Sequence, residues 1–309
     1  MSRPADPLRV FDRRAVRAHR ARAARAPQLA DFLVAESAER LLDRLDDVLR
    51  RFPLALDLGC RDGVLARLLR GRGGIETLIH ADAAFEFARQ APPPRLVAEA
   101  EALPFKAESL DLVLSNLDLH WTNDLPGALL QLRRCLKPDG LLLAALFGGD
   151  TLVELRGALM EAELAEEGGA SPRVSPVADV RDLGMLLQRA GFALPVVDSE
   201  RVTVTYPDAL ALMRDLRAMG ETNAVAERRR GFTRRSTLAR AATLYAERHG
   251  RPDGRIAAHF EIITLTAWAP HESQPKPLKP GSAKARLAEA LGTQEKPAGE
   301  KAGRPLDRR

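Results

Sequence analysis

The stretch LALDLGCRDG, residues 54–63, decides the fold of this chain. Its first five residues are an apolar run interrupted only by Asp57, which predicts a short buried strand, and helical spacing begins after Gly63. Gly59 and Gly63 allow a tight turn that a ligand can approach without meeting a Cβ. Because the stretch differs from G-x-G-x-x-G and has no P-loop lysine, it does not indicate a phosphate cradle. We interpret it as a ligand-binding turn between a strand and a helix; a turn with no ligand is the alternative.

Outward from this turn, residues 52–147 alternate between strand and helix patterns, which is typical of βαβ units and a parallel sheet. The predicted strands are Leu54–Leu58, Thr77–Ala81, Leu96–Ala98, Leu110–Asn116 and Leu141–Phe147. The predicted helices between them are Val64–Arg70, Ala83–Gln90 and Leu125–Leu136, the last one closed by a turn over residues 137–140. The fifth strand is apolar throughout and is expected at the centre of the sheet.

Helical and strand patterns also flank this core. Residues 29–50 predict a covering helix, and four further helices are expected over Thr151–Leu164, Val177–Ala190, Asp208–Met219 and Arg235–His249. Val196–Val204 offers strand material, and Ala257–Trp268 predicts a long strand that completes the sheet. Beyond Pro270 the chain is rich in Pro, Lys and Gly and buries too little apolar surface to stay ordered.

Composition narrows the class of protein. The 309 residues carry a formal net charge of +5, but acidic residues are mixed through most of the chain, so nucleic-acid binding is not indicated. No apolar run approaches the roughly 20 residues that a membrane-spanning helix needs. The two cysteines, Cys60 and Cys135, form neither a disulfide framework nor a metal-ligand spacing. A reducing cytoplasmic setting is therefore expected.

The segment VFDRRAVRAHRARAARA, residues 10–26, is rich in arginine and favours a helix. We expect this helix to pack over the main domain. A transit peptide is a second interpretation, against which Asp6 and Asp12 argue. A helix on a membrane surface is a third, but its apolar face is mostly alanine and too thin to anchor.

Polar residues stand at the ends of four predicted strands. In an open α/β sheet, ligands bind outside the carboxyl ends of the strands, where the strand order reverses. Asp57 at the end of the first strand can hold a cationic amine, and Asp82 after the second can pair with ribose hydroxyls or cap a helix. Glu99 after the third strand can accept from an adenine amino group or remain a solvated charge. Asn116, at the end of the fourth, is expected to face the same crevice.

The order and spacing of these residues resemble those of Rossmann-like methyltransferases that depend on S-adenosylmethionine. The residues that carry the resemblance are Asp57, Gly59, Gly63, Asp82, Glu99, Leu103-Pro104-Phe105, Asp111 and Lys137-Pro138-Asp139-Gly140. The resemblance implies an α/β fold with a mostly parallel seven-stranded sheet, an antiparallel last strand and helical additions. It also implies S-adenosylmethionine as the cofactor, bound by Asp57, Gly59, Gly63, Asp82, Glu99 and Asn116, and no metal.

Several longer stretches resemble a narrower family, the complex I assembly factor 5 family. They are Phe11–Arg13, Phe52–Cys60, Leu119–Pro126, Phe147–Leu152, Glu154–Arg156, Ser175-Pro176, Asp182–Gly184, Arg189–Phe192, Asp215-Leu216, Met219–Asn223 and His271–Gln274. The likeness runs from about Val10 to about Ala283. It implies an enzyme of respiratory complex I assembly that hydroxylates an arginine of a partner subunit. A bacterial relative in the cytoplasm is expected, and contact with the inner membrane surface is left open.

One departure from the pattern concerns the turn itself. Arg61 stands where the family of methyltransferases usually has the middle glycine, and Glu99 stands where aspartate is commoner. Arginine permits the turn if its side chain points outward. For catalysis the sequence offers weak candidates only: His120 as a general base, because its free pKa lies near the working pH, and Asp150 as a contact for a guanidinium. No facial-triad spacing indicates a metal, and Asp118 with His120 supplies only half of one.

Three functions therefore compete. The first is modification of an arginine of a complex I subunit, and the second is O-methylation of a malonyl carrier protein, whose methyltransferases are more distantly similar. The third is an assembly chaperone that binds S-adenosylmethionine without turning it over. We expect covering helices over 1–51, a cofactor-binding core over 52–147, a helical substrate or lid region over 148–256, a final strand over 257–269 and a largely disordered tail over 270–309.

Overall fold

The computed structural model of the chain describes residues 9–26, 31–176, 179–275 and 292–293. The chain divides into two compact units, Met1–His271 and Glu272–Arg309, and every helix and strand given below lies in the first. The predicted tail over 270–309 falls largely outside the described residues, and so do residues 1–8 of the predicted N-terminal helical region.

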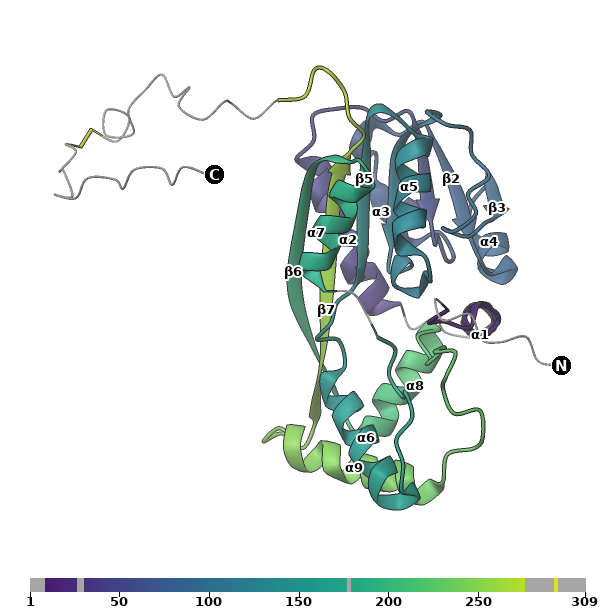
Figure 1. Cartoon of the computed structure of the whole chain (residues 1–309), viewed down its shortest axis with the longest axis vertical. Coiled ribbons are helices and arrows are strands. Elements are labelled where there is room, and N and C mark those ends of the chain that lie inside the picture. Colours follow the sequence, from purple (N-terminus) through teal and green to yellow (C-terminus); the bar gives the residue numbers. More distant parts are fainter. Residues whose placement is uncertain (1–8, 27–30, 177–178, 276–291, 294–309) are drawn as a thin grey trace, which may run out of the picture. The chain divides into compact units, whose positions relative to one another are not determined.

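The centre of the molecule is a seven-stranded sheet with the order β3-β2-β1-β4-β5-β7-β6 (Figure 1). Strands β1 to β5 run parallel to one another, whereas β7 is antiparallel to both β5 and β6. The strands are β1 (Leu54–Leu58), β2 (Thr77–Asp82), β3 (Arg95–Val97), β4 (Leu110–Asn116), β5 (Leu136–Phe147), β6 (Ala193–Tyr206) and β7 (Ile256–Trp268). This confirms the predicted fold class, a mostly parallel sheet completed by an antiparallel strand.

Helices cover both faces of this sheet and extend beyond its end (Figure 1). The longer ones are α1 (Arg13–Ala24), α2 (Phe32–Asp46), α5 (Leu125–Cys135), α6 (Val153–Glu167), α7 (Val180–Arg189), α8 (Ala209–Met219) and α9 (Arg235–His249). The shorter ones are α3 (Val64–Leu69), α4 (Phe85–Gln90) and the 3-10 turns η1 (Arg72–Gly74) and η2 (Leu119–Trp121). Among the described residues, no helix is both long enough and apolar enough to cross a bilayer.

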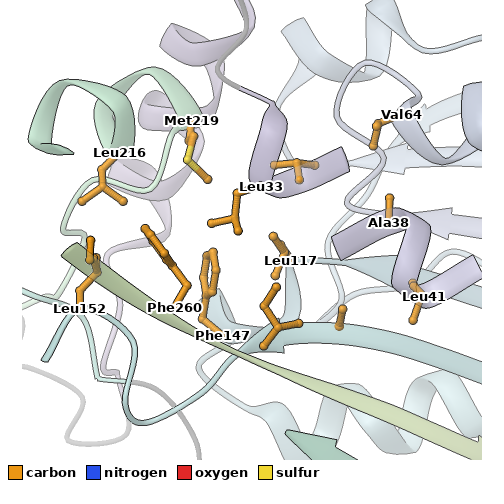
Figure 2. Close-up of a cluster of buried hydrophobic side chains, with 14 of the residues drawn as sticks. Leu33, Ala38, Leu41, Val64, Leu117, Phe147, Leu152, Leu216, Met219 and Phe260 are labelled. Atoms are coloured by element: carbon orange, nitrogen blue, oxygen red, sulfur yellow. The ribbon is translucent and has the colours of Figure 1, made fainter. Parts of the chain in front are cut away.

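Two apolar clusters, one on each face, hold these layers together. One unites α5 and α7 with the sheet, and the other unites α2, α3, α6, α8 and α9 with it. Figure 2 shows part of the second cluster, where Leu33 lies between Met219 and Leu117, and Phe147 lies beside Phe260. A fully buried leucine contributes about 1.5–3 kcal/mol relative to an exposed one. The cluster therefore ties the helices beyond the sheet end firmly to the core.

The junction between α5 and β5 differs from the prediction of a turn over residues 137–140. Helix α5 ends at Cys135 and β5 already begins at Leu136, which pairs with Leu110 of β4. Two backbone hydrogen bonds with Ala269 extend the ladder here, from Asp139 N–H to Ala269 O and from Ala269 N–H to Gly140 O. Pairing with a segment 130 residues away thus includes the expected turn in the strand as a bulge, where Asp139 has a φ of +63° and the register with β4 shifts.

The arginine-rich N-terminal segment forms α1, which confirms the predicted helix packed over the main domain. Its cap is Asp12, whose Oδ1 accepts from the N–H groups of Arg14 and Ala15. The buried face of α1 contains three alanines, Val16 and, unexpectedly, Arg20. The helix contacts α4 on one side and α8 on the other, at the carboxyl end of the parallel strands. It therefore lies over the crevice in which ligands of such sheets bind.

Candidate functional site

Of the predicted crevice residues, Asp57, Gly59 and Asp82 lie at the carboxyl ends of β1 and β2. Gly59 has a φ of +77°, and its N–H donates to the carbonyl of Ala81 in β2. A Cβ at Gly59 would overlap the side chain of Asp118, which follows β4. The glycine is therefore required where the turn passes closest to an acidic residue of a neighbouring strand, as the sequence predicts for a tight turn.

Asp57 is the most isolated polar group of the crevice. Its side chain is buried, and neither carboxylate oxygen has a hydrogen-bond partner in the described part of the chain. Burial and the nearby charge of Asp82 raise the pKa of this carboxyl well above its ordinary value. An orphaned buried carboxyl of this kind suits an amine or another donor from a ligand.

Asp82 has all its partners within the chain. Its carboxylate accepts two hydrogen bonds from the guanidinium of Arg20, from Nε to Oδ1 at 3.2 Å and from Nη2 to Oδ2. It also accepts from the backbone N–H groups of Arg61 and Ala84, at 3.0 and 2.8 Å. Burial by itself would lower the pKa of Arg20, but the charges of Asp82 and Asp118 outweigh it and raise that pKa. The predicted ribose carboxylate is thus already saturated.

Arg61 points inward and the turn still forms, whereas the sequence allowed an arginine here on the condition that its side chain points outward. The residue adopts φ +52° and is buried, and its Nη2 donates to the carbonyl of Met219 at 2.8 Å. Its guanidinium lies over the ring of Phe87, 4.8 Å from the centroid, which is a cation–π distance. Burial and the charge of Arg20 lower the pKa of Arg61. Phe87 and the Met219 carbonyl, both far along the chain, give the inward side chain its partners.

Two other predicted residues are engaged by the N-terminal helices. Glu99 pairs with Arg13 at 3.2 Å and with Arg17 at 2.5 Å, both from α1. Asn116 does not offer its amide to the crevice, because Ser37 donates to its Oδ1 and its Nδ2 donates to the carbonyl of Val34. These hydrogen bonds, both to α2, place Asn116 as a tie between β4 and a covering helix.

A second site lies beside the crevice, as a cavity of about 670 Å³ between the sheet end and helices α6, α8 and α9. Its apolar walls include Phe147 and Phe260, whose rings lie side by side in Figure 2 at an interplanar angle of 41°. Five arginines line it as well: Arg173, Arg217, Arg228, Arg229 and Arg230. Phe232, which also lines it, is 99% exposed and stands at the surface.

Glu221 is the acidic residue of this cavity, and its side chain is only 7% exposed. Its Oε2 accepts from Trp121 Nε1 at 3.0 Å and lies 3.1 Å from His120 Nε2. Burial would raise the pKa of Glu221, but His120 and then Arg61 and Arg20 outweigh burial and lower it. An ionised carboxylate therefore sits among aromatic rings, where water competes poorly for it.

The two predicted catalytic candidates lie in different places. His120 lines the cavity and contacts Phe147, with ring centroids 4.9 Å apart. Asp150 is exposed, pairs with Arg201 at 2.9 Å and is not among the residues that line the cavity. In the described part of the chain, no group of three or more His, Cys, Asp or Glu side chains is placed to hold a metal ion.

Sequence reasoning overlooked Glu221 and Arg20 as site residues. Glu221 belongs to the stretch Met219–Asn223, which carried the family resemblance but suggested no role of its own. Arg20 is one of many arginines in its helix, and only its spacing from Arg13 and Arg17 distinguishes it. That spacing puts all three arginines on one face of a helix, and this shared face was the feature of the sequence that could have identified Arg20 as a site residue.

Comparison with known proteins assigns this arrangement to a class. Residues 56–144 match the family model of the methyltransferase domain. The fold is similar to that of the YcgJ protein from Bacillus subtilis, with a TM-score of 0.53 and 15% identity over 75% of this chain and 99% of that one. The chain is thus an enzyme of the methyltransferase superfamily, with the Rossmann-like fold of that class.

Closer relatives narrow the class. The chain is 45% identical to the mitochondrial arginine-hydroxylase NDUFAF5 of Danio rerio, over 84% of its own length and 82% of the relative's. It is 40% identical to the malonyl-[acyl-carrier protein] O-methyltransferase of Halorhodospira halophila, over 84% and 88% of the two lengths. The chain belongs to the arginine-hydroxylase NDUFAF5 family, which confirms the resemblance found in the sequence.

Proposed function

We propose that this chain hydroxylates an arginine side chain of a complex I subunit during assembly of that complex. The oxidant is dioxygen together with an external donor of two electrons, so that one oxygen atom enters a C–H bond of the arginine and the other leaves as water. The observation that carries the proposal is the ionised Glu221 in the cavity, and the name of the relatives supports it. Glu221 Oε2 is used by His120 and Trp121, whereas Oε1 receives no hydrogen bond from the described residues. A guanidinium donates in a planar fork that matches a carboxylate, so it suits the remaining oxygen.

The walls of the cavity support the same substrate. Trp121, Phe147 and Phe260 are among the lining residues, so a guanidinium that enters the cavity comes close to aromatic rings. Four of the five arginines that line the cavity have acidic partners, since Arg173 pairs with Glu163, Arg228 and Arg230 with Asp12, and Arg229 with Glu167. Their positive charge is thus partly compensated, and it repels an incoming arginine less than their number suggests.

S-adenosylmethionine is the proposed cofactor, held by Asp57, Asp82 and Glu99 around the turn of Gly59 and Gly63. When bound, it supplies a sulfonium centre with an electrophilic methyl group. The residues of the crevice fit S-adenosylmethionine, because Asp57 is a buried carboxyl without a hydrogen-bond partner in the described part of the chain and Gly59 leaves no Cβ in the turn. Asp82 is available only when Arg20 has left it. Asn116, which the sequence suggested as a further contact, stays with α2.

The test is the mass of the partner subunit from cells that contain wild type or Glu221→Gln. Wild type should add one oxygen atom to an arginine, whereas Glu221→Gln should abolish the addition because a neutral amide no longer attracts the guanidinium. Glu227→Gln is the matched control, since Glu227 is exposed on the same loop. A gain of one methyl group would replace hydroxylation by methyl transfer. Unmodified subunit in fully assembled complex I would exclude both modifications of the subunit, and would leave the chaperone function and methylation of another substrate.

The malonyl-carrier methyltransferases suggest a second function. Arg217 lines the cavity, is exposed and has no ion pair with any described residue, so it could receive the carboxylate of a malonyl group. Growth of a biotin-requiring strain that carries this gene would favour O-methylation of a malonyl thioester. Failure to restore growth would exclude that reaction as the main function.

A further inference from the structure

Helix α1 presents three arginines to the acids of the cofactor crevice. Arg13, Arg17 and Arg20 are spaced by four and three residues, so they share one face of the helix. Arg13 and Arg17 pair with Glu99, while Arg20 pairs with Asp82 and lies 3.1 Å from Asp118. Two of the three proposed cofactor acids are therefore held by α1.

Arg20 cannot share Asp82 with a ribose. Its guanidinium covers both carboxylate oxygens, and the two backbone donors of Arg61 and Ala84 take the remaining directions. The guanidinium groups of Arg20 and Arg61 both lie over the ring of Phe87, 5.6 and 4.8 Å from its centroid. The ribose position and the Arg20 position thus coincide at one carboxylate.

We propose that α1 is a gate on the cofactor crevice: Arg20 occupies the ribose carboxylate Asp82, and a nucleoside binds only when Arg20 leaves. The gate rests on the cofactor site proposed above. The closed state is favoured without ligand, because a buried carboxylate holds a charged partner more strongly than neutral hydroxyls. The apparent affinity for the nucleoside is reduced by the fraction of molecules that are open.

The same helix holds the wall of the substrate cavity. Phe11, just before α1, packs edge-on against Trp121 at 5.3 Å between centroids, and the cap Asp12 pairs with Arg228 at 3.2 Å. Next to Glu221, the carbonyl of Thr222 lies 3.0 Å from His19 Nδ1. Movement of α1 therefore changes contacts on both sides of Glu221. Through this helix the gate couples cofactor binding to the shape of the substrate cavity.

The test is calorimetric titration of the full chain with S-adenosylhomocysteine. Arg20→Ala should bind it at least about tenfold more tightly than wild type, since the open fraction no longer limits affinity. Arg14→Ala is the matched control, because Arg14 lies on the same helix, is exposed and makes no ion pair with the described residues. Should Arg20→Ala fold poorly, Asp118→Asn removes one partner of Arg20, leaves Asp82 intact and should also tighten binding.

Hydrogen exchange gives a second readout that does not depend on affinity. Addition of S-adenosylhomocysteine to wild type should speed exchange of the α1 amides, because the helix loses its arginine contacts. Weaker or unchanged binding by both variants, or slower exchange in α1, would overturn the gate and leave the cofactor site in place. Absence of binding by wild type and by both variants would overturn the gate and the cofactor proposal together.

Discussion

Asp57 makes the stability of the ligand-free chain depend on pH. Its pKa is raised by burial and by Asp82, so the folded chain keeps a proton that the unfolded chain has lost. The free energy of unfolding therefore falls as the pH rises from the ordinary value of 3.8 toward the raised pKa. Asp57→Asn removes this loss and should stabilise the ligand-free chain at neutral pH by about 1–3 kcal/mol.

Urea unfolding of both proteins at several pH values checks this prediction. The difference between Asp57→Asn and wild type should shrink to nothing as the pH is lowered through the ordinary value. The exposed Asp47 at the end of α2 provides the control, since Asp47→Asn should keep the pH dependence of wild type. A destabilised Asp57→Asn at neutral pH would mean that the carboxylate has a partner in solution.

At this scale the sequence predicts residues whose role is set by their own turn. Asp57, Gly59 and Asp82 follow from strand ends and glycine positions, which are local. Glu221 does not, because its contact with Trp121 spans 100 residues, and Arg20 reaches Asp82 across 62 residues. No local pattern encodes such pairs, so the sequence offers His120 of the substrate cavity but not the carboxylate beside it.

Helix α2 is tied to β4 by the amide of Asn116. Asn116→Ala removes the acceptor of the Ser37 hydroxyl and the donor to the Val34 carbonyl, all in a buried setting. The expected cost is about 1–3 kcal/mol of unfolding free energy. Ser37→Ala removes one of the two hydrogen bonds and should cost less, which denaturant unfolding of both variants will show. Full stability of Asn116→Ala together with lost S-adenosylhomocysteine binding would return Asn116 to the cofactor site.

The existence of the elements followed from periodicity, whereas several of their boundaries did not, the start of β5 most of all. The predicted bounds of α9 match the observed Arg235–His249, because its helical pattern is long and bounded by loop residues. The start of β5 was missed, since Lys137-Pro138-Asp139-Gly140 has the composition of a turn. The stretch is a bulge within β5, in which Asp139 keeps a φ of +63°, and its pairing with Ala269 cannot be read from the local sequence.

For the whole molecule, the folded unit Met1–His271 predicts which truncations survive. A chain that ends after Gln274 keeps all seven strands described above and should therefore fold and unfold cooperatively on heating. A chain that ends after Pro252 lacks β7, which pairs with β5 on one side and β6 on the other, and should not fold. Circular dichroism with heating distinguishes the two. A stable fold without β7 would contradict the central role given to that strand.

The place of β7 also sets an order on how the protein is made. β7 is the last described strand along the chain, but it lies between two earlier strands in the sheet. A growing polypeptide on the ribosome therefore cannot complete the sheet in the order in which its strands are made. Until residue 268 has left the exit tunnel, the backbone N–H and C=O groups along one edge of β5 stay unpaired, and β6 lacks the strand with which it pairs. Over that interval the nascent chain exposes unpaired strand edges that other chains can bind. Premature termination is therefore expected to yield a product that aggregates instead of a smaller enzyme.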